Sequence, residues 1–335
     1  MITADQLSSI DDLDRLREEW CALLSRCPDA TPFQHPGWLI PWWRYFGSGD
    51  LLTLAIRVDG QLVALAPMFL HDWAGRRQIT LLGTGTSDYL DIVADPRHAS
   101  EAMRCVYDCL QRQRDRWDTC DWQDLLSGSA IMRTLPAEFS VEESKSEPCV
   151  AVPLPEGTPA DWFAALPHGL RRNLRRYRQH LETRGTVECT RCDSDPDGAL
   201  LRALFDLHTQ RWQHKGGEGV LGSESLYYFH REVCQELGIA GLLRFYIIRM
   251  ADRIVAIIYG YCFRNTFYSY LGGFDPELTP FSPGSLILHY GISQAMEERV
   301  RRWDFLRGEE RYKFDWGGVS VPKHRVLLQA LSQSR

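Results

Sequence analysis

The chain has 335 residues, enough for two domains that each bury a core of their own. Hydrophobic residues make up 44% and charged residues 24%, as in soluble globular proteins, and a net charge of −6 excludes nucleic-acid binding through a general positive field. The longest uncharged apolar run, Ile254–Phe263, is too short to cross a bilayer, and the first residues lack a secretory pattern. We therefore expect a cytoplasmic protein without a transmembrane segment.

The predicted elements of the first half are helices followed by strands. In chain order the patterns predict helices near 11–24 and 37–46, a hairpin of strands 51–58 and 62–69, strands at 79–82 and 89–93, a helix at 100–114 and a strand at 122–126. Asp59-Gly60 supplies the turn of the hairpin. Residues 136–160 contain five prolines and are expected to be a linker that encloses one strand, 149–154.

The second half repeats this order. The patterns predict helices at 170–183, 197–212 and 223–237, a hairpin over 243–263, a strand at 266–272, a helix at 285–300 and a strand at 303–306. Helices, then a strand meander, then a helix and a last strand make an α/β layered unit with a mixed sheet.

The two halves also share sequence. Residues 56–64 match residues 248–256 at an offset of 192, and the same shift carries Trp20 onto Trp212. Further along the chain, Leu82-Gly83 matches Leu271-Gly272, and 124–128 matches 304–308. A repeat of this length indicates a duplicated domain. We expect an N-terminal domain at 1–145 and a C-terminal domain at 146–335.

The predicted start of the helix near 283 is a candidate anion site. Ser282 suits the N-cap and Pro283 the first helical position, and Gly284 allows close approach to the backbone. The N–H groups of Gly284, Ser285 and Leu286 would then face a diphosphate at the positive end of the helix. An ordinary capped helix start is the alternative.

The strand before this helix ends in a glycine pair. Gly272 and Gly273, between Leu271 and Phe274, are typical of a bulge or of a strand that a ligand backbone approaches closely. Tyr270 carries a hydroxyl that could act as a general acid. A plain strand end followed by a turn is the other interpretation.

Charged residues cluster around the last predicted strand. Asp304 lies within the strand and Glu309 follows its end, and a carboxylate at such an edge can accept a proton from an amine. Arg307 and Lys313 are candidate substrate contacts in the same segment. The alternative is a salt-bridged surface turn.

Three other groups are candidate substrate contacts. Arg171, Arg172 and Arg175 belong to a basic helix whose guanidinium groups suit phosphate or carboxylate. Arg211 and Lys215 have no counterparts in the first half. Asp88, Tyr89 and Asp91 of the first half could bind hydroxyls or an amine of an acceptor, although a capped turn would explain them equally. No His, Cys and carboxylate set with metal-ligand spacing is evident, so we expect no metal.

Taken as an ordered set, these segments resemble the CelD/BcsL-like acyltransferases of the GNAT superfamily, relatives of the FemAB peptidyltransferases. The segments that carry the resemblance are 31–34, 87–91, 171–174, 207–208 with 211–212, 273–276, 282–284, 304–309, Tyr312-Lys313 and Trp316. The resemblance implies two tandem GNAT-like domains, with the cofactor site in the second. GNAT enzymes usually carry Q/R-x-x-G-x-G/A at the helix start, whereas residues 281–286 have one glycine and no leading Gln or Arg.

The function that follows is transfer of an acyl group, acetyl or another, from acyl-CoA to an amine or hydroxyl. The acceptor is expected to be a small or glycan-linked anion, as in polysaccharide biosynthesis, held between the domains. Glu309 is the first candidate for the proton acceptor, with Tyr270 and Asp304 as the others. Two alternatives stay open: a FemAB-type aminoacyl transferase that uses aminoacyl-tRNA, and a non-catalytic scaffold. The sequence leaves the oligomeric state undetermined.

Overall fold

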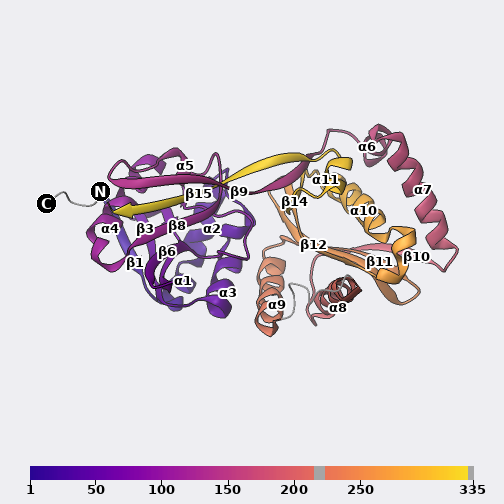
Figure 1. Cartoon of the computed structure of the whole chain (residues 1–335), viewed down its shortest axis with the longest axis horizontal. Helices are drawn as coiled ribbons and strands as arrows, with labels where there is room; N and C mark the ends of the chain where they lie inside the picture. Colours follow the sequence, from indigo (N-terminus) through magenta and orange to yellow (C-terminus); the bar gives the residue numbers. More distant parts are fainter. Residues whose placement is uncertain (215–222, 331–335) are drawn as a thin grey trace. The chain divides into compact units, whose positions relative to one another are not determined.

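A computed structural model describes residues 1–214 and 223–330, apart from the side chains of 211–214 and 330. The chain divides into two compact units (Figure 1). The first comprises Met1–Pro148 together with the residues from Val321 onward, and the second is Cys149–Ser320. The chain leaves the first unit within strand β9 (Phe139–Pro153) and returns to it within strand β15 (Val319–Ala330).

This division differs in two places from the boundary expected at 145/146. The segment 136–160, predicted to be a linker, is largely the 15-residue strand β9, followed by helix α6 (Pro159–Ala165). Its prolines were misleading, because Pro148 lies inside the strand and Pro153 ends it. The C-terminal strand β15 pairs with β8 of the first unit, from Lys323↔Leu126 to Leu328↔Cys120, so this segment is placed with the first unit.

The first unit contains two groups of paired strands. One, in the order β1-β3-β4-β7, is antiparallel throughout. In the other, β15 pairs with β8, β8 pairs in parallel with β6, and β5 and β2 follow. The strands are β1 (Ile2–Leu7), β2 (Asp50–Leu51), β3 (Thr53–Val58), β4 (Gln61–Ala66), β5 (Met68–Trp73), β6 (Arg76–Leu81), β7 (Val93–Ala94) and β8 (Thr119–Leu126).

Helices of the first unit pack on these strands or on one another. They are α1 (Ile10–Arg15), α2 (Arg17–Arg26), α3 (Pro36–Phe46), α4 (Ala99–Arg112) and α5 (Ala130–Arg133). Met103, Val106 and Leu110 repeat at helical spacing on α4 and are buried in the core with Trp122 of β8.

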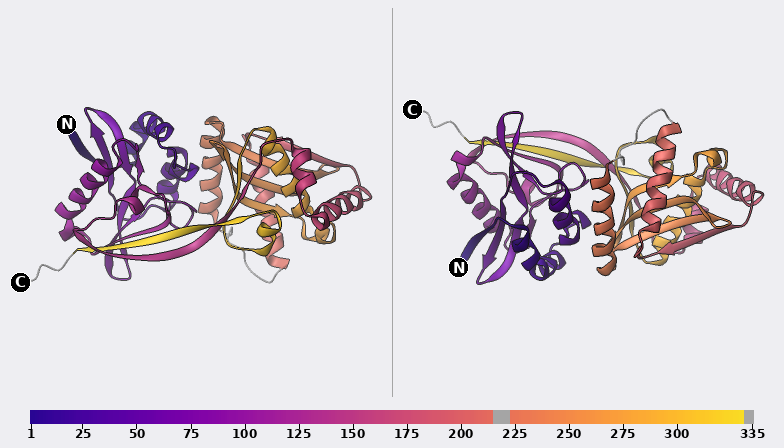
Figure 2. Two further views of the ribbon diagram at one scale, coloured as in Figure 1. Left: turned by 90° about the horizontal axis from the view of Figure 1, so that it is seen from above. Right: turned by 90° about the horizontal axis from the view of Figure 1, so that it is seen from below.

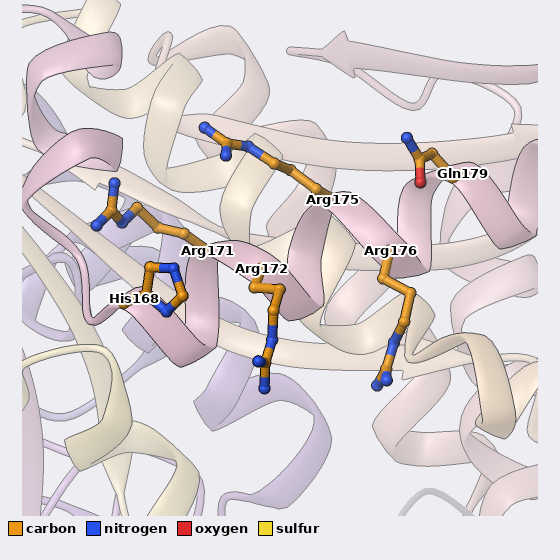
Figure 3. A pocket seen from close by; sticks show the side chains of 6 residues that line it. All are labelled: His168, Arg171, Arg172, Arg175, Arg176 and Gln179. Atoms are coloured by element: carbon orange, nitrogen blue, oxygen red, sulfur yellow. The ribbon is translucent and has the colours of Figure 1, made fainter.

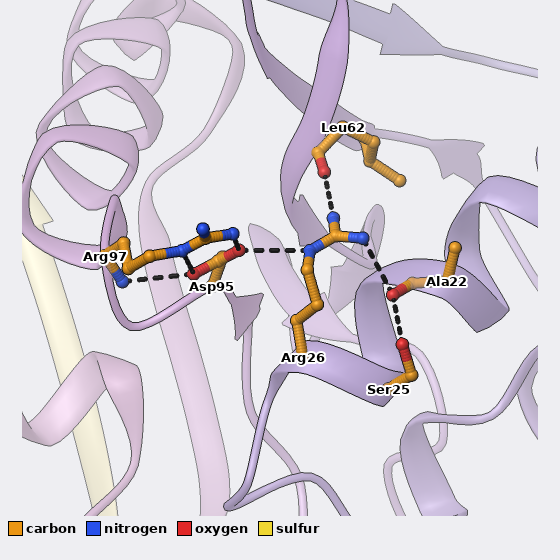
Figure 4. A network of polar contacts seen from close by, with 6 residues as sticks. All are labelled: Ala22, Ser25, Arg26, Leu62, Asp95 and Arg97. Atoms are coloured by element: carbon orange, nitrogen blue, oxygen red, sulfur yellow. Dashed lines mark hydrogen bonds and ion pairs between the residues drawn. The ribbon is translucent and has the colours of Figure 1, made fainter.

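A buried carboxylate joins α2 to the strands of this unit (Figure 4). Asp95 is 2% exposed and accepts hydrogen bonds from the side chains of Arg26, at 3.0 Å, and Arg97, at 2.8 Å. Arg26 also donates to the Leu62 carbonyl of β4 at 2.7 Å. The arginines, Arg97 foremost, hold the pKa of Asp95 far below its usual range.

Replacing this carboxylate should make the protein less stable and less sensitive to acid. Because hydrogen bonds to charged groups contribute about 1.5–3 kcal/mol, we expect Asp95→Asn to lower the free energy of unfolding by roughly that amount at pH 7. A depressed pKa gives stability that is present above the unfolded value of about 3.9 and lost as pH falls below it. Denaturant titrations should therefore show wild type and variant converging between about pH 4 and pH 2. An unchanged difference at pH 2 would contradict this account.

The second unit is built on one six-stranded mixed sheet. Its order is β10-β11-β12-β13-β14-β9, with β13 and β14 parallel and the other neighbours antiparallel. The strands are β10 (Val187–Cys192), β11 (Leu243–Met250), β12 (Arg253–Phe263), β13 (Thr266–Phe274) and β14 (Arg302–Arg307). Alternation is weak in β11 and β12, where 245–248 and 255–259 are all buried, as expected for strands covered on both faces.

Helices cover both faces of this sheet (Figures 1 and 2). The helices α8 (Ala199–His214) and α9 (Glu224–Ile239) lie on one face, and α10 (Pro283–Glu297) lies on the other, against β11 and β12. The helices α6 and α7 (His168–Glu182) pack against α10. At Gly291 a Cβ atom would lie 2.8 Å from the Trp303 ring, so glycine is what allows α10 to approach the sheet this closely.

The duplication predicted from sequence is visible in the backbone. The hairpin β3–β4 has a bulge between Ile56 and Arg57, and β11–β12 has one between Ile248 and Arg249, 192 positions later. The turn residues Asp59 and Ala251, at the same offset, both have a φ of +48°. In each unit a parallel pair follows the hairpin, β6 with β8 and β13 with β14. Each unit can therefore be compared with the other.

Within the described residues, no helix has both the length and the apolar character that a bilayer crossing requires.

Candidate active site

The candidate site begins where two parallel strands separate. Strands β13 and β14 pair only over three positions, from Thr266↔Arg302 to Tyr268↔Asp304. Beyond Tyr268, β13 continues for six residues to Phe274, and β14 continues to Arg307. Beyond Tyr268, the backbone edge of β13 on the side of β14 is therefore not paired with β14 and can bind another group.

A β-bulge marks the point of separation. On the other side of β13, the pairing with β12 shifts between Tyr259↔Leu271 and Gly260↔Ser269, so that Tyr270 is the extra residue. Gly260 is required there, because a Cβ atom on it would lie 2.1 Å from the Tyr268 carbonyl oxygen. Bulges bend a strand and redirect its side chains, and they are frequent beside active sites. Tyr270 thus lies at the base of the opening.

The opening is a cleft of about 410 Å³. Its walls are the end of β13, the first turn and a half of α10, and Phe305 and Arg307 of β14 with α11 (Arg311–Asp315). Ten of the residues singled out from the sequence line it: Tyr270, Leu271, Gly272, Gly273, Phe274, Ser282, Gly284, Ser285, Arg307 and Lys313. The cleft is large enough for part of a cofactor-sized molecule.

The helix start offers fewer amide donors than the sequence predicted. Ser282 is the N-cap, but in a left-handed conformation with φ of +46°, and its hydroxyl makes no capping bond. Its carbonyl oxygen accepts from the amides of Ser285, at 3.0 Å, and Leu286, at 3.2 Å. The prediction of three available amides is therefore wrong for Ser285 and Leu286, and the Leu286 side chain is also buried, as is Pro283. The Gly284 amide and the hydroxyls of Ser282 and Ser285 are the donors that remain at the cleft.

Two of the glycines have a packing role as well. A Cβ atom on Gly284 would lie 3.2 Å from the Phe274 ring, so this ring, rather than a ligand, makes the closest approach to Gly284. On Gly273 a Cβ atom would lie 3.0 Å from Leu207, which shows that this glycine lets α8 pack on β13. Gly272 is exposed and has only ordinary contacts, so it leaves that part of β13 accessible from the cleft.

Lys313 organises the loop after β14. It is 2% exposed, and its Nζ donates to the carbonyl oxygens of Arg307, at 2.6 Å, Gly308, at 2.9 Å, and Leu306, at 3.3 Å. The same nitrogen forms an ion pair with Glu310 at 2.8 Å. These contacts use the three protons of the ammonium group, so Lys313, predicted as a substrate contact, holds the floor of the cleft in place.

Removing this ammonium group should loosen the cleft. Because Lys313→Met leaves buried carbonyl groups without a donor, we expect it to lower the free energy of unfolding by about 2–4 kcal/mol. Arg should not substitute, since its planar fork cannot reproduce one compact nitrogen among three oxygens. Thermal unfolding of Lys313→Met and Lys313→Arg would check this, with Lys145→Met, a change of an exposed lysine, as the control. Wild-type stability of Lys313→Met would contradict the role assigned to the lysine.

The carboxylates are arranged differently from the prediction. Glu310 lines the cleft, whereas its exposed neighbour Glu309 does not. A Cβ atom on Gly308 would lie 2.7 Å from a Glu310 carboxylate oxygen, so the carboxylate lies over that glycine. Asp304 is fully buried below the cleft, where it accepts from the Leu306 amide at 2.9 Å and from Arg302 at 2.9 Å. The first of these contacts stabilises the left-handed backbone conformation of Leu306, which has a φ of +60°. Asp304 therefore has a structural role.

The family comparison covers all the residues that line this cleft. Residues 168–314 match the family described as "Acetyltransferase (GNAT) domain". These residues form a GNAT-type acetyltransferase domain. The cleft of the GNAT domain is the opening between β13 and β14.

Solved structures extend the likeness to the whole chain. FemX superimposes with a TM-score of 0.67 at 11% identity over 97% of this chain and 96% of its own. L-PGS from Bacillus licheniformis superimposes with a TM-score of 0.56 at 10% identity, over 95% of this chain and 92% of its own. A tandem GNAT protein from the clavulanic acid biosynthesis pathway superimposes with a TM-score of 0.51 at 13% identity, over 100% of both chains. At these identities the likeness concerns the fold. It confirms the predicted α/β class with two tandem GNAT-like domains. No curated protein matches the chain by sequence.

Behind Tyr270 the GNAT domain carries a buried polar group that sequence analysis did not single out. Its members are Tyr259, Tyr261 and His230; the Tyr261 hydroxyl donates to Tyr259, and His230 Nδ1 lies 3.3 Å from the Tyr259 hydroxyl. Burial lowers the pKa of His230 to about 3, so the imidazole is neutral at pH 7. The His230 and Tyr270 ring centroids are 5.1 Å apart. The groups behind Tyr270 are therefore buried and uncharged, whereas the cleft that Tyr270 lines also contains Arg307, Glu310 and Lys313.

The first-unit candidates are held by structural contacts. Asp91 accepts from the amides of Ala130, at 2.7 Å, and Ile131, at 3.3 Å, and so caps α5. Tyr89 is 2% exposed, and the buried Lys323 donates to the Asp88 carbonyl oxygen at 3.1 Å. The hollow beside Asp91 is only about 20 Å³.

The arginines of α7 lie outside the cleft (Figure 3). Arg171, Arg172 and Arg175, together with Arg176, border a separate hollow on this helix. The side chains of Arg171 and Arg175 point to one side of the helix, and those of Arg172 and Arg176 point to the other. The side chain of Arg211 and all of Lys215 are outside the described residues.

Among the described residues, no three His, Cys, Asp or Glu side chains are grouped so that they could hold a metal ion.

Proposed function

We propose that this protein transfers an acyl group from an acyl-CoA thioester to an amine or hydroxyl of a small or glycan-linked acceptor. The observation that carries the proposal is the cleft between β13 and β14, with a free strand edge on one side and the start of α10 at one end. The GNAT-type domain at 168–314 supports acyl-CoA as the donor class.

The donor would lie along β13. Beyond Tyr268, the backbone edge of β13 is no longer paired with β14. The amides of a pantetheine arm can form hydrogen bonds with this edge. Its diphosphate would meet the Gly284 amide and the hydroxyls of Ser282 and Ser285, at the end of α10 where the helix dipole favours an anion. The exposed Arg307 supplies a cation at the same cleft. These groups fit a diphosphate with fewer amides and more hydroxyls than the usual glycine-rich loop.

The chemistry needs one proton acceptor and one proton donor. The acceptor nitrogen or oxygen attacks the thioester carbonyl, a new C–N or C–O bond forms, and the C–S bond breaks. Glu310 is the carboxylate placed to take the proton from the nucleophile, with its position fixed by Lys313. The Tyr270 hydroxyl is placed to donate a hydrogen bond or a proton to the departing sulfur. Glu310 thus replaces Glu309 as the candidate base.

The experiment that tests this function has two steps. Calorimetric titration with acetyl-CoA and longer acyl-CoAs should give one-to-one binding, and acceptors from a panel of amino sugars and anionic glycans should then release free thiol. Binding without thiol release from any acceptor would point to a scaffold. No heat with any CoA would reject the proposed donor.

A second candidate is an aminoacyl transferase, the activity implied by a FemAB-like resemblance. The fold of the whole chain is similar to those of FemX and L-PGS, which favours it. Against it, α8 and α9 pack on β11–β13 and do not project as an arm in the part of the chain that is described. Binding of aminoacyl-tRNA with transfer of its aminoacyl group, and no response to acyl-CoA, would establish this alternative.

A further inference from the structure

A second cavity lies in the same unit, on the far side of α10 from the cleft. It has a volume of about 510 Å³ and is bordered by α6, α7, α10, β10 and β11. Its lining is mainly apolar, from Phe163, Leu174, Val187, Ile248, Leu286 and Tyr290. Helix α10 contributes to both cavities, with Leu286 facing this one and Ile287 and Leu288 the cleft.

The mouth of this apolar cavity is cationic. Arg175 and Gln179 line it and also line the hollow on α7 that contains Arg171, Arg172 and Arg176 (Figure 3). The Arg175 guanidinium lies 5.5 Å from the Phe163 ring centroid, directly beside the apolar wall. Arg178, the other arginine of the cavity, is held by Glu182 and by the Val187 carbonyl oxygen. The apolar cavity and the cationic hollow therefore share a border formed by Arg175 and Gln179.

Four of the five arginines of α7 have no acidic partner in the described part of the chain. Arg171, Arg172, Arg175 and Arg176 form no ion pair with any carboxylate among the described residues, although the chain has an excess of acidic groups. Such a surface attracts anions, and guanidinium groups suit phosphate oxygens in particular. An apolar cavity beside it can hold a hydrocarbon chain.

We propose that α7 and α10 form a binding site for a single-chain amphiphile with a phosphate head group. The hydrocarbon chain enters the cavity beneath α7, and the phosphate is bound by Arg175, with Arg171 on the same side of the helix. A phosphorylated, chain-bearing acceptor or its carrier lipid has this chemistry. The site is separate from the thioester cleft, and it stands whether or not acyl-CoA is the donor.

The test uses the full-length protein and alkyl phosphates below their micelle concentrations. Calorimetric titrations with hexyl, octyl and decyl phosphate should give affinities that rise about fourfold for each added methylene, as expected from burial of the chain. Inorganic phosphate and decyl glucoside should each bind at least tenfold more weakly than decyl phosphate. Inorganic phosphate lacks the hydrocarbon chain, and decyl glucoside lacks the phosphate group. Equal affinity of decyl phosphate with either probe would overturn the proposal.

Two variants locate the site. Arg175→Glu removes the cation at the mouth, and Ser293→Phe fills the cavity from α10 without removing a core side chain. Each should weaken decyl phosphate binding at least tenfold, while Arg104→Glu, an exposed helix arginine of the first unit, should leave it unchanged. Melting temperatures show which variants are folded. Wild-type affinity for decyl phosphate in folded Arg175→Glu and Ser293→Phe would contradict the site. Loss of decyl phosphate binding in Gly284→Trp would also contradict it, because that result would place the ligand in the thioester cleft.

Discussion

We expect Glu310→Gln to lower the rate of acyl transfer by about 10²–10⁴-fold, the contribution typical of a general base. The amide keeps the shape of the side chain but cannot accept the proton of the attacking nucleophile. The affinity for acyl-CoA should change little, because the proposed donor contacts are on β13 and α10. Thiol release at saturating donor and acceptor measures the effect.

The neighbouring residue provides a matched control. Glu309→Gln makes the same chemical change one position away, on a side chain that does not line the cleft. It should keep a rate within about twofold of wild type, as is usual for surface changes away from the chemistry. If Glu309→Gln were the slow variant and Glu310→Gln the active one, the sequence-based choice of Glu309 would be restored and the assignment made here would fail.

The second large effect is expected at the start of α10. A Trp side chain at position 284 would project into the cleft and press on the Phe274 ring, whose nearest atom lies 3.2 Å from the Cβ position. We expect Gly284→Trp to weaken acyl-CoA binding at least 100-fold, a loss of about 2.7 kcal/mol in binding free energy. Calorimetry with acetyl-CoA measures the loss.

A glycine of the first unit shows whether a bulky substitution matters by itself. Gly128 is exposed, has open space around its Cβ position and has an ordinary backbone conformation, so Gly128→Trp should bind acetyl-CoA as wild type does. Circular dichroism and the melting temperature establish that both variants are folded. Full binding by a folded Gly284→Trp protein would show that the donor does not use this helix start.

Local patterns predicted most of the second unit. Turn chemistry and apolar runs located the β11–β12 hairpin and the strand before α10, because their side chains are covered on both faces and leave a clear signature. The repeat at an offset of 192 residues was also informative, because both hairpins have a bulge and a left-handed turn residue at positions related by this offset. Strand β15 was missed because its partner, β8, lies about 200 residues earlier in the chain.

The site was harder to predict because the cleft depends on contacts that sequence does not display. Glu309 and Glu310 are adjacent and identical in type, and only the backbone after Gly308 decides which one faces the cleft. One signal was available for Lys313: the chain has four lysines against 34 arginines, and two of them, Lys313 and Lys323, are buried and bind backbone carbonyl oxygens. In so arginine-rich a chain, a lysine indicates a place where a compact ammonium group is needed.

The most direct test of the account is a crystal structure of the protein grown with coenzyme A. We expect the pantetheine arm beside β13, between Tyr270 and Phe274, with the diphosphate at Gly284 and Ser285. Coenzyme A found elsewhere on the protein, or a fully ordered cleft closed by the Phe274 ring at millimolar coenzyme A, would contradict it.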